Sequence, residues 1–148
     1  MYIKVENSYS EELEESFSFL IPQLKISFPP LTREELTSLL ASDASTLLTA
    51  RDETTSQIIG MLTLIVYRVP TGVRARIEDV VVDESMRGRG IAVQLVERAL
   101  EIAREKGADG VALTSNPKRE AANRLYQKVG FKKWETNVYF YKFWFYRF

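Results

Sequence analysis

The fold is decided by residues 80–92, which read Val80-Val81-Val82-Asp83-Glu84-Ser85-Met86-Arg87-Gly88-Arg89-Gly90-Ile91-Ala92. Three consecutive valines predict a buried strand, because a strand this apolar is usually covered on both faces. A glycine-rich turn with two arginines follows, and helical periodicity begins at Ile91. The backbone N–H groups of such a turn and of a helix N-terminus form a cradle for an anion. The stretch therefore predicts a strand–turn–helix unit that binds phosphate.

Patterns on either side of this unit predict a mixed order of strands and helices. Alternating or continuous apolar runs indicate strands at Tyr2–Glu6, Thr46–Ala50, Ile58–Val69, Val73–Val82, Val111–Thr114, Phe131–Thr136 and Val138 to the end. Capping boxes at Ser8-x-x-Glu11 and Thr32-x-x-Glu35 predict two helices, the first of which stops before Pro22. This order indicates a mixed sheet with helices on both faces.

Two more helices follow the central strands. The first carries Ile91, Leu95, Ala99 and Ile102 on one face and stops at Gly107. For the second, Asn116 and Pro117 supply a cap and a first residue, and Gly130 closes the helix. Its buried stripe is expected to contain Ala122, Leu125 and Val129. The 148 residues suit a single domain, 1–148, with a core of ordinary size.

Composition excludes several classes of function. The 20 basic and 20 acidic residues cancel, which argues against nucleic acid or an anionic membrane as a partner. Without cysteine or histidine, the chain has no thiolate nucleophile, and we expect no metal site. Acid–base chemistry must then use Asp, Glu, Tyr, Lys, a terminus or water. No apolar stretch approaches the roughly 18 residues of a membrane span, and the N-terminus lacks the apolar core of a signal peptide, so a cytoplasmic location is the simplest reading.

The turn fits neither of two common phosphate motifs. A P-loop needs Gly-x-x-x-x-Gly-Lys-Ser/Thr, and a dinucleotide fingerprint needs Gly-x-Gly-x-x-Gly. Here Gly88 and Gly90 let the backbone approach a phosphate, and Arg87 and Arg89 can add charge-assisted hydrogen bonds. The alternative is an ordinary strand-to-helix turn with solvated arginines. The pattern Arg-x-x-Gly-x-Ala, from Arg87 to Ala92, resembles the pyrophosphate-binding motif of the GNAT superfamily of acyl-CoA N-acyltransferases.

A second segment extends the resemblance. Residues 119–131 read Arg119-Glu120-Ala121-Ala122-Asn123-Arg124-Leu125-Tyr126-Gln127-Lys128-Val129-Gly130-Phe131. They are similar to the superfamily's second signature, in which Ala-x-x-Leu-Tyr is followed by Gly-Phe, and the similarity spans Ile58 to Trp134. Many members carry Asn where this chain has Arg119. Either Asn116 or Asn123 can supply the missing pantetheine hydrogen bond, although Asn116 also suits a helix cap.

The resemblance implies an α/β (α+β) GNAT fold, with a mixed central sheet of about seven strands. It also implies direct transfer of an acetyl group from acetyl-CoA to the primary amine of a small molecule or peptide. Tyr126 would protonate the departing thiolate; otherwise it is only an amphipathic helix residue. The implied cofactor-binding residues are Val80, Val81, Val82, Arg87, Gly88, Arg89, Gly90, Ile91, Ala92, Asn116, Asn123 and Tyr126.

Glu78 and Asp79 are candidates for the general base. They precede the buried valines, where desolvation would raise a carboxylate pKa. Alternatively, these carboxylates pair with Arg74, Arg76 or a helix terminus, and water relays the proton. The sequence Ile77-Glu78-Asp79 is similar to that of the glucosamine-6-phosphate N-acetyltransferases.

The C-terminus, from Tyr139 to Phe148, is unusually aromatic. It either packs inside its own sheet or forms the interface of a homodimer. Two other functions remain open: a non-catalytic acyl-CoA-binding sensor with the same fold, and a protein-interaction subunit that uses the aromatic tail.

Overall fold

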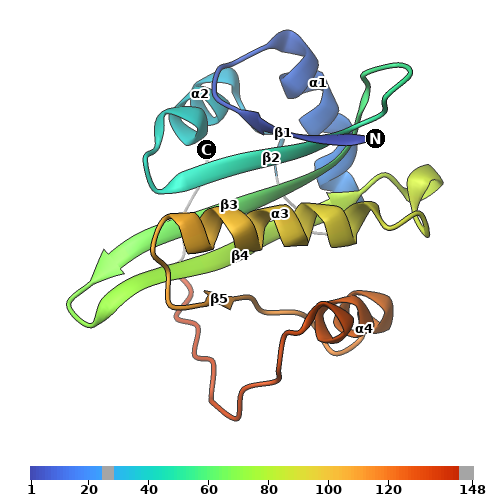
Figure 1. Cartoon of the computed structure of the whole chain (residues 1–148). Helices are drawn as coiled ribbons and strands as arrows, with labels where there is room; N and C mark the ends of the chain where they lie inside the picture. Colours follow the sequence, from blue (N-terminus) through green and yellow to red (C-terminus); the bar gives the residue numbers. More distant parts are fainter. Residues whose placement is uncertain (25–28, 144–148) are drawn as a thin grey trace. The chain divides into compact units, whose positions relative to one another are not determined.

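A computed structural model describes residues 1–24 and 29–143 and divides the chain into two compact units, Met1–Ser115 and Asn116–Phe148 (Figure 1). The expectation of a single domain, 1–148, stays a prediction.

The first unit is built on a five-stranded sheet in the order β1-β2-β3-β4-β5. Its strands are β1 Tyr2–Glu6, β2 Ser45–Arg51, β3 Ile58–Val69, β4 Gly72–Val82 and β5 Val111–Ala112. All neighbours pair antiparallel except β4 and β5, which are parallel. The predicted mixed sheet is confirmed, with five strands in the described residues instead of about seven.

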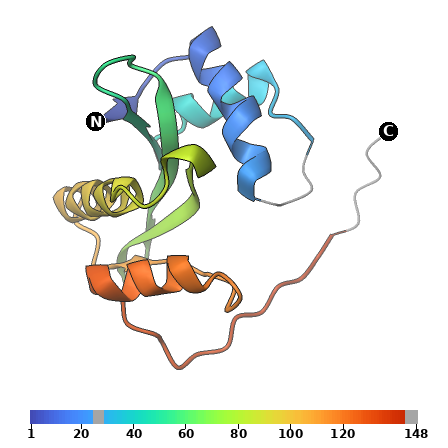
Figure 2. The same cartoon turned by 90° about the vertical axis from the view of Figure 1, so that its right-hand side faces the viewer.

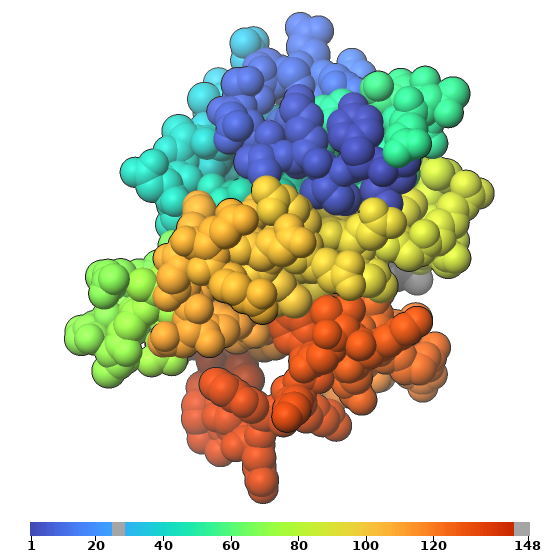
Figure 3. Space-filling model, viewed as in Figure 1, coloured from blue at the N-terminus to red at the C-terminus, as the bar shows by residue number. Residues whose placement is uncertain are grey.

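Helices cover both faces of this sheet. Helix α3 (Ile91–Glu105) lies on one face, and α1 (Glu11–Leu20) and α2 (Arg33–Ala41) lie on the other (Figure 2). The predicted apolar stripe of α3, formed by Ile91, Leu95, Ala99 and Ile102, is buried in full. Figure 3 shows the outer side of this helix. On the opposite face, side chains of α1, α2, β2, β3 and β4 form one apolar core: Leu13, Phe17, Leu20, Leu36, Leu47, Ile58, Met61 and Val81.

The helix starts show which capping predictions were right. Thr32 and Glu35 form the expected capping box of α2, since each side chain bonds the other's backbone N–H. Helix α1 is instead capped by Ser10, whose hydroxyl accepts from Leu13 N at 3.1 Å, so the prediction of Ser8 was wrong. After α1 the chain continues as the 3-10 turn η1 (Ile21–Leu24).

A buried ion network ties β1 and β2 to α1. Arg51 donates to Glu6 at 2.8 Å and to Glu12 at 3.0 Å. Thr49 donates to the same oxygen of Glu6 at 2.7 Å. Burial alone would raise the pKa of Glu6, but the hydrogen bonds from Thr49, Arg51 and Lys4 outweigh it and lower that pKa. The network therefore holds Glu6 ionised inside the unit.

The second unit contains helix α4 (Glu120–Val129), which Gly130 ends as predicted. Its N-cap is Arg119, so the predicted start at Asn116 and Pro117 was wrong. Asn116 instead folds the preceding turn, because its side chain accepts from Lys118 N at 2.9 Å and its carbonyl accepts from Arg119 N at 3.0 Å.

The stripe of α4 also differs from the prediction. Ala122, Leu125 and Val129 are only half-buried, and Tyr126 is the buried residue of the helix.

The predicted C-terminal strands are absent from the described residues. Residues 131–143 form no strand, and the end of the second predicted strand lies outside the described part of the chain. A strand needs a partner for its backbone groups, and the sheet of the described residues includes none of residues 131–141. The large side chains of this segment are consequently exposed: Trp134 80%, Val138 74%, Tyr139 88%, Phe140 87% and Tyr141 82%. Within the described residues, no helix is both long and apolar enough to cross a membrane.

Candidate active site

Strand β4 carries a bulge just before the buried valines. Glu78 pairs with Thr63, and Val81 pairs with Met61, so Asp79 and Val80 together oppose one residue of β3. Asp79 has a φ of +51°, in the left-handed region that Asp tolerates better than most residues. A bulge leaves backbone groups unpaired and redirects the following side chains.

The edge of β4 that faces away from β3 is paired with another strand only in its first half. Strand β5 pairs with β4 only at Ala75–Val111 and Arg76–Ala112. From Ile77 to Val82 that edge has no ladder partner among the described residues. It therefore offers a row of backbone donors and acceptors to an extended ligand. Ligands of sheets with parallel strands commonly bind where the carboxyl ends of neighbouring strands part.

The predicted phosphate-binding turn connects this edge to α3. The 3-10 turn η2 (Glu84–Met86) is capped by Asp83 and is followed by Gly88, with φ +77°, and Gly90, with φ +74°. No atom lies within 4 Å of the position that a Cβ would take at either glycine. Gly90 is the N-cap of α3 and provides no side-chain cap, so the first N–H groups of the 15-residue helix remain available to an anion.

The arginines of the turn are available as well. The Nε atom of Arg87 donates to Val82 O at 3.3 Å, while its guanidinium lies 3.8 Å from Glu84. Arg87 and Arg89 are both exposed. These contacts orient Arg87 beside the turn without burying its charge, which leaves the guanidinium able to bind a phosphate.

A side chain that the sequence did not indicate holds the start of this turn. The side-chain oxygen of Gln23, in η1, accepts from Glu84 N at 2.8 Å. The two residues are 61 positions apart, so no local pattern could have identified the pair.

The two predicted base candidates lie in different surroundings. Glu78 forms an ion pair with Arg76 at 3.2 Å, which is one of the alternatives left open by the sequence. Desolvation, and then the charge of Glu78, raise the pKa of Asp79. Register places Glu78 on the same sheet face as Thr63 and Met61, the face that α1 and α2 cover.

The remaining predicted residues belong to the second unit. Tyr126 is buried, and its ring meets that of Phe131 edge to face at a centroid distance of 5.9 Å. Burial raises the pKa of the Tyr126 phenol, partly offset by Arg119, so the hydroxyl keeps its proton at neutral pH. Asn123 Nδ2 donates to the carbonyls of Asn116 and Arg119 at 2.9 and 3.0 Å.

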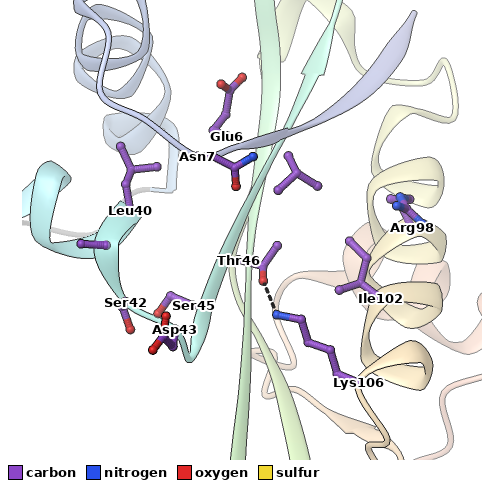
Figure 4. Close-up of a pocket in the computed structure, with 12 residues that line it drawn as sticks. Glu6, Asn7, Leu40, Ser42, Asp43, Ser45, Thr46, Arg98, Ile102 and Lys106 are labelled. Atoms are coloured by element: carbon purple, nitrogen blue, oxygen red, sulfur yellow. Dashed lines mark hydrogen bonds between the residues drawn. The ribbon is translucent and has the colours of Figure 1, made fainter.

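A separate pocket of about 330 Å³ lies beside the second half of α3 (Figure 4). Arg98 and Ile102 line it from α3, and Lys106, the C-cap residue of that helix, donates from Nζ to Thr46 at 3.2 Å. Its polar lining also includes Asn7, Ser42, Asp43 and Ser45. No residue of the β4 bulge or of the glycine turn lines it, so it is not part of the candidate site.

Comparison with known proteins agrees with this geometry. Residues 6–131 match the model of the Acetyltransferase (GNAT) family. The chain is 32% identical to "Probable glucosamine 6-phosphate N-acetyltransferase 2" of Oryza sativa subsp. japonica, over 93% of this chain and 88% of the relative. It is 38% identical to "Glucosamine 6-phosphate N-acetyltransferase" of Trypanosoma brucei brucei, over 57% of each chain.

A solved structure supports the same assignment. The crystal structure of a Trypanosoma brucei acetyltransferase superposes with a TM-score of 0.76 at 28% identity, covering 95% of this chain and 99% of that one. The bulged β4, the glycine turn that opens α3 and the helix containing Tyr126 all lie inside the matched residues. The chain therefore belongs to the acetyltransferase (GNAT) family.

Proposed function

We propose that this acetyl-CoA-dependent N-acetyltransferase acetylates the amine of a phosphorylated amino sugar. The main observation that supports a binding site for acetyl-CoA is the open glycine turn, Gly88 to Gly90, at the N-terminus of α3, which has no side-chain cap. The acceptor class is supported by the names of relatives at 32% and 38% identity.

In this proposal the donor lies along the free edge of β4 and ends at the turn. The N–H groups from Gly88 to Ala92 and the guanidinium groups of Arg87 and Arg89 bind the pyrophosphate. Backbone groups of Val80–Val82 pair with the pantetheine arm, as the family resemblance implies. Asn116 and Asn123 remain candidates for a further pantetheine contact, although both side chains hydrogen-bond within their own unit.

The reaction forms an N–C bond and breaks the C–S bond of the thioester. The amine attacks the carbonyl carbon, a base takes one proton from the nitrogen, and the thiolate that leaves receives a proton from an acid. Tyr126 is the proposed acid because its phenol is protonated at neutral pH. Of the two carboxylates, Asp79 suits the base better than Glu78, since Glu78 already pairs with Arg76.

Release of free thiol from acetyl-CoA tests the proposal. The acceptors are glucosamine 6-phosphate, glucosamine, an aminoalkylphosphonate and a short peptide with a free N-terminus. Glucosamine 6-phosphate should give a kcat/KM at least about tenfold above that of glucosamine, because one charge-assisted hydrogen bond to the phosphate is worth that much. Turnover of another amine, with none of glucosamine 6-phosphate, would reject this acceptor class while leaving the acetyltransferase activity standing.

The alternative is a sensor that binds acyl-CoA without turnover. The solvent-accessible Asp79 and the protonated Tyr126 favour catalysis over sensing. Calorimetric binding of acetyl-CoA, with no thiol release across the acceptor panel, would favour the sensor.

We also propose a homodimer that covers the exposed aromatic side chains between Trp134 and Tyr141. A protein-interaction subunit would use the same surface with a different partner. A cytoplasmic location stays a prediction from the sequence, and cell fractionation tests it.

A further inference from the structure

The pocket of about 330 Å³ beside the second half of α3 forms where β1 stops short of β2 (Figure 4). Strand β1 ends at Glu6, which pairs with Leu47, so Ser45 and Thr46 have no strand partner on that side within the described sheet. The C-terminal ends of α2 and α3 border this gap. Small-molecule sites have volumes of about 300–1,000 Å³, so the pocket suits a small ligand.

The α3 side of the pocket carries a cation without a carboxylate partner. Lys106 Nζ donates to the buried Thr46 at 3.2 Å, as the dashed line in Figure 4 marks. Lys106 forms no ion pair with any residue that the structure describes. The bond to Thr46 therefore holds an ammonium group at the pocket, and its other N–H donors can bind an anionic group.

The α2 side of the same pocket carries negative charge. The side chain of Asp43 makes neither an ion pair nor a hydrogen bond within residues 1–24 and 29–143, and Figure 4 shows it on the opposite side from Lys106. At the end of α2, the carbonyls of Leu40 and Ala41 accept no hydrogen bond from the described residues, so they add partial negative charge. The end of α3 differs, because backbone N–H groups already bond to the carbonyls of Ile102, Ala103 and Arg104.

The other two charged side chains on the lining already have partners. Arg98 pairs with Glu101 at 2.9 Å, and the buried Glu6 pairs with Arg51 at 2.8 Å. Polar side chains that make no hydrogen bond in the described part of the chain complete the lining: Asn7, Ser42 and Ser45. The charges left for a ligand are consequently one positive and one negative.

We propose that this pocket binds a small zwitterion, a free amino acid, with its carboxylate at Lys106 and its ammonium group at Asp43 and the end of α2. A simple anion would be repelled by Asp43, and a simple cation would be repelled by Lys106. A molecule with both charges pairs with each of them through a charge-assisted hydrogen bond. The proposal does not depend on the acetyltransferase reaction, because no residue of the β4 bulge or of the glycine turn lines this pocket.

The test titrates ligands into labelled protein at constant ionic strength and follows its backbone amide signals by two-dimensional NMR. The ligands are glycine, β-alanine and γ-aminobutyrate, which hold the two charges at increasing separation. Acetate and methylammonium each carry one of the charges alone. The variants are Lys106→Met and Asp43→Asn, with Lys128→Met at the end of α4 and Glu97→Gln on the exposed side of α3 as matched controls.

At least one of the three amino acids should bind with a Kd of about 1 mM and shift the amide signals of Asn7, residues 42–45 and Lys106. Lys106→Met and Asp43→Asn should each raise that Kd about tenfold or more, because each removes one charge-assisted hydrogen bond. Acetate and methylammonium should bind about tenfold more weakly than that amino acid for the same reason. The two control variants should leave the Kd unchanged, and all four variants should bind acetyl-CoA as the wild type does.

Urea unfolding shows whether each variant folds. Asp43→Asn breaks no bond among the described residues, so it keeps the test decisive if Lys106→Met loses stability through its bond to Thr46. Three results would overturn the proposal. One is a folded wild type that binds none of the three amino acids at high millimolar concentration. Another is acetate binding as tightly as the amino acids with no effect of Asp43→Asn, which would make this an anion site only. The third is an equal loss in the control variants, which would show a dependence on net charge alone.

Discussion

The side-chain oxygen of Gln23 accepts a hydrogen bond from Glu84 N at 2.8 Å and so joins η1 to the first residue of η2. The same amide group donates from Nε2 to Phe19 O at 3.4 Å, which orients it from α1. Val81, at the end of β4, shares a hydrophobic cluster with Leu20 and with Ile21 of η1. The helical segment that precedes α2 therefore supports the entrance to the glycine turn.

Replacing Gln23 should weaken the donor site. Gln23→Leu removes the acceptor for Glu84 N, and we expect the Kd of acetyl-CoA to rise about fivefold, the value of one net hydrogen bond. Calorimetry measures this Kd. Gln57→Leu is the matched control, because Gln57 is exposed in the β2–β3 turn, outside the glycine turn and the β4 bulge. Equal Kd values for both variants would show that the Gln23 bond does not support the site.

Arg87 should matter for binding and little for stability. Its contacts are a 3.3 Å hydrogen bond to Val82 O and an exposed ion pair with Glu84, and such surface pairs contribute little to stability. A charge-assisted bond to a phosphate contributes more, so Arg87→Ala should raise the Kd of acetyl-CoA about 10- to 100-fold. Arg104→Ala, at the other end of α3, controls for the loss of one positive charge. An equal loss of affinity for acetyl-CoA in both variants would show that binding depends on net charge and not on a specific contact of Arg87.

Sequence patterns predicted the elements whose causes are local. The bounds of β3, the capping box of Thr32 and the stripe of α3 follow from residues near one another in the chain. The bulge at Asp79 depends on the register between β3 and β4, which no single strand encodes. The start of α4 was misplaced because Asn116-Pro117 suits a helix cap as well as the turn that it forms.

The same limit applied to the candidate site. The glycine turn was predicted from its own residues, whereas Gln23 reaches the turn through a contact with Glu84, 61 positions away in the sequence. The C-terminal strands were predicted from alternation and aromatic content, but a strand forms only against a partner.

Asp79→Asn should separate catalysis from donor binding. Asn tolerates the left-handed φ of +51°, so the bulge should persist, and acetyl-CoA should bind as in the wild type. If Asp79 is the base, kcat should fall about 100-fold or more. Glu78→Gln is the matched variant and should lower kcat less than Asp79→Asn does, because Glu78 pairs with Arg76. A larger fall in kcat for Glu78→Gln than for Asp79→Asn would indicate that Glu78 is the base.

The raised pKa of Asp79 also predicts a stability change. A carboxyl whose folded pKa lies above its unfolded value binds its proton more tightly in the folded state. That contribution to stability is complete below the unfolded pKa and is lost as pH rises through the folded pKa. Asp79→Asn should therefore increase the free energy of unfolding at pH 7 relative to wild type, measured by urea unfolding. A decrease would show that the ionised carboxylate stabilises the fold.

Arg51 should be needed for stability at neutral pH. Arg51→Met would leave Glu6 buried without its main partner, which costs about 3–5 kcal/mol. The pKa of Glu6 is lowered, so its stabilising contribution is present above its ordinary value of 4.5 and is lost as pH falls through the folded pKa. The difference in the free energy of unfolding between wild type and variant, measured with urea, should be smaller at about pH 3 than at pH 7. Arg74→Met, at an exposed arginine, should change stability by less than about 0.5 kcal/mol at both pH values.

The aromatic C-terminal segment should become buried when two chains associate. Trp134 is 80% exposed in the single chain, and Tyr139 and Phe140 are 88% and 87% exposed. In a Trp144→Phe variant, which leaves one tryptophan, the emission of Trp134 should shift to shorter wavelength as concentration rises into the high micromolar range. Sedimentation should show a dimer over the same range. Tyr139→Lys should abolish both changes, whereas Tyr67→Lys, at an exposed aromatic residue of β3, should not. If the protein stays monomeric and the emission of Trp134 is constant at every concentration, the dimer proposal is wrong, and the aromatic surface would serve a different partner.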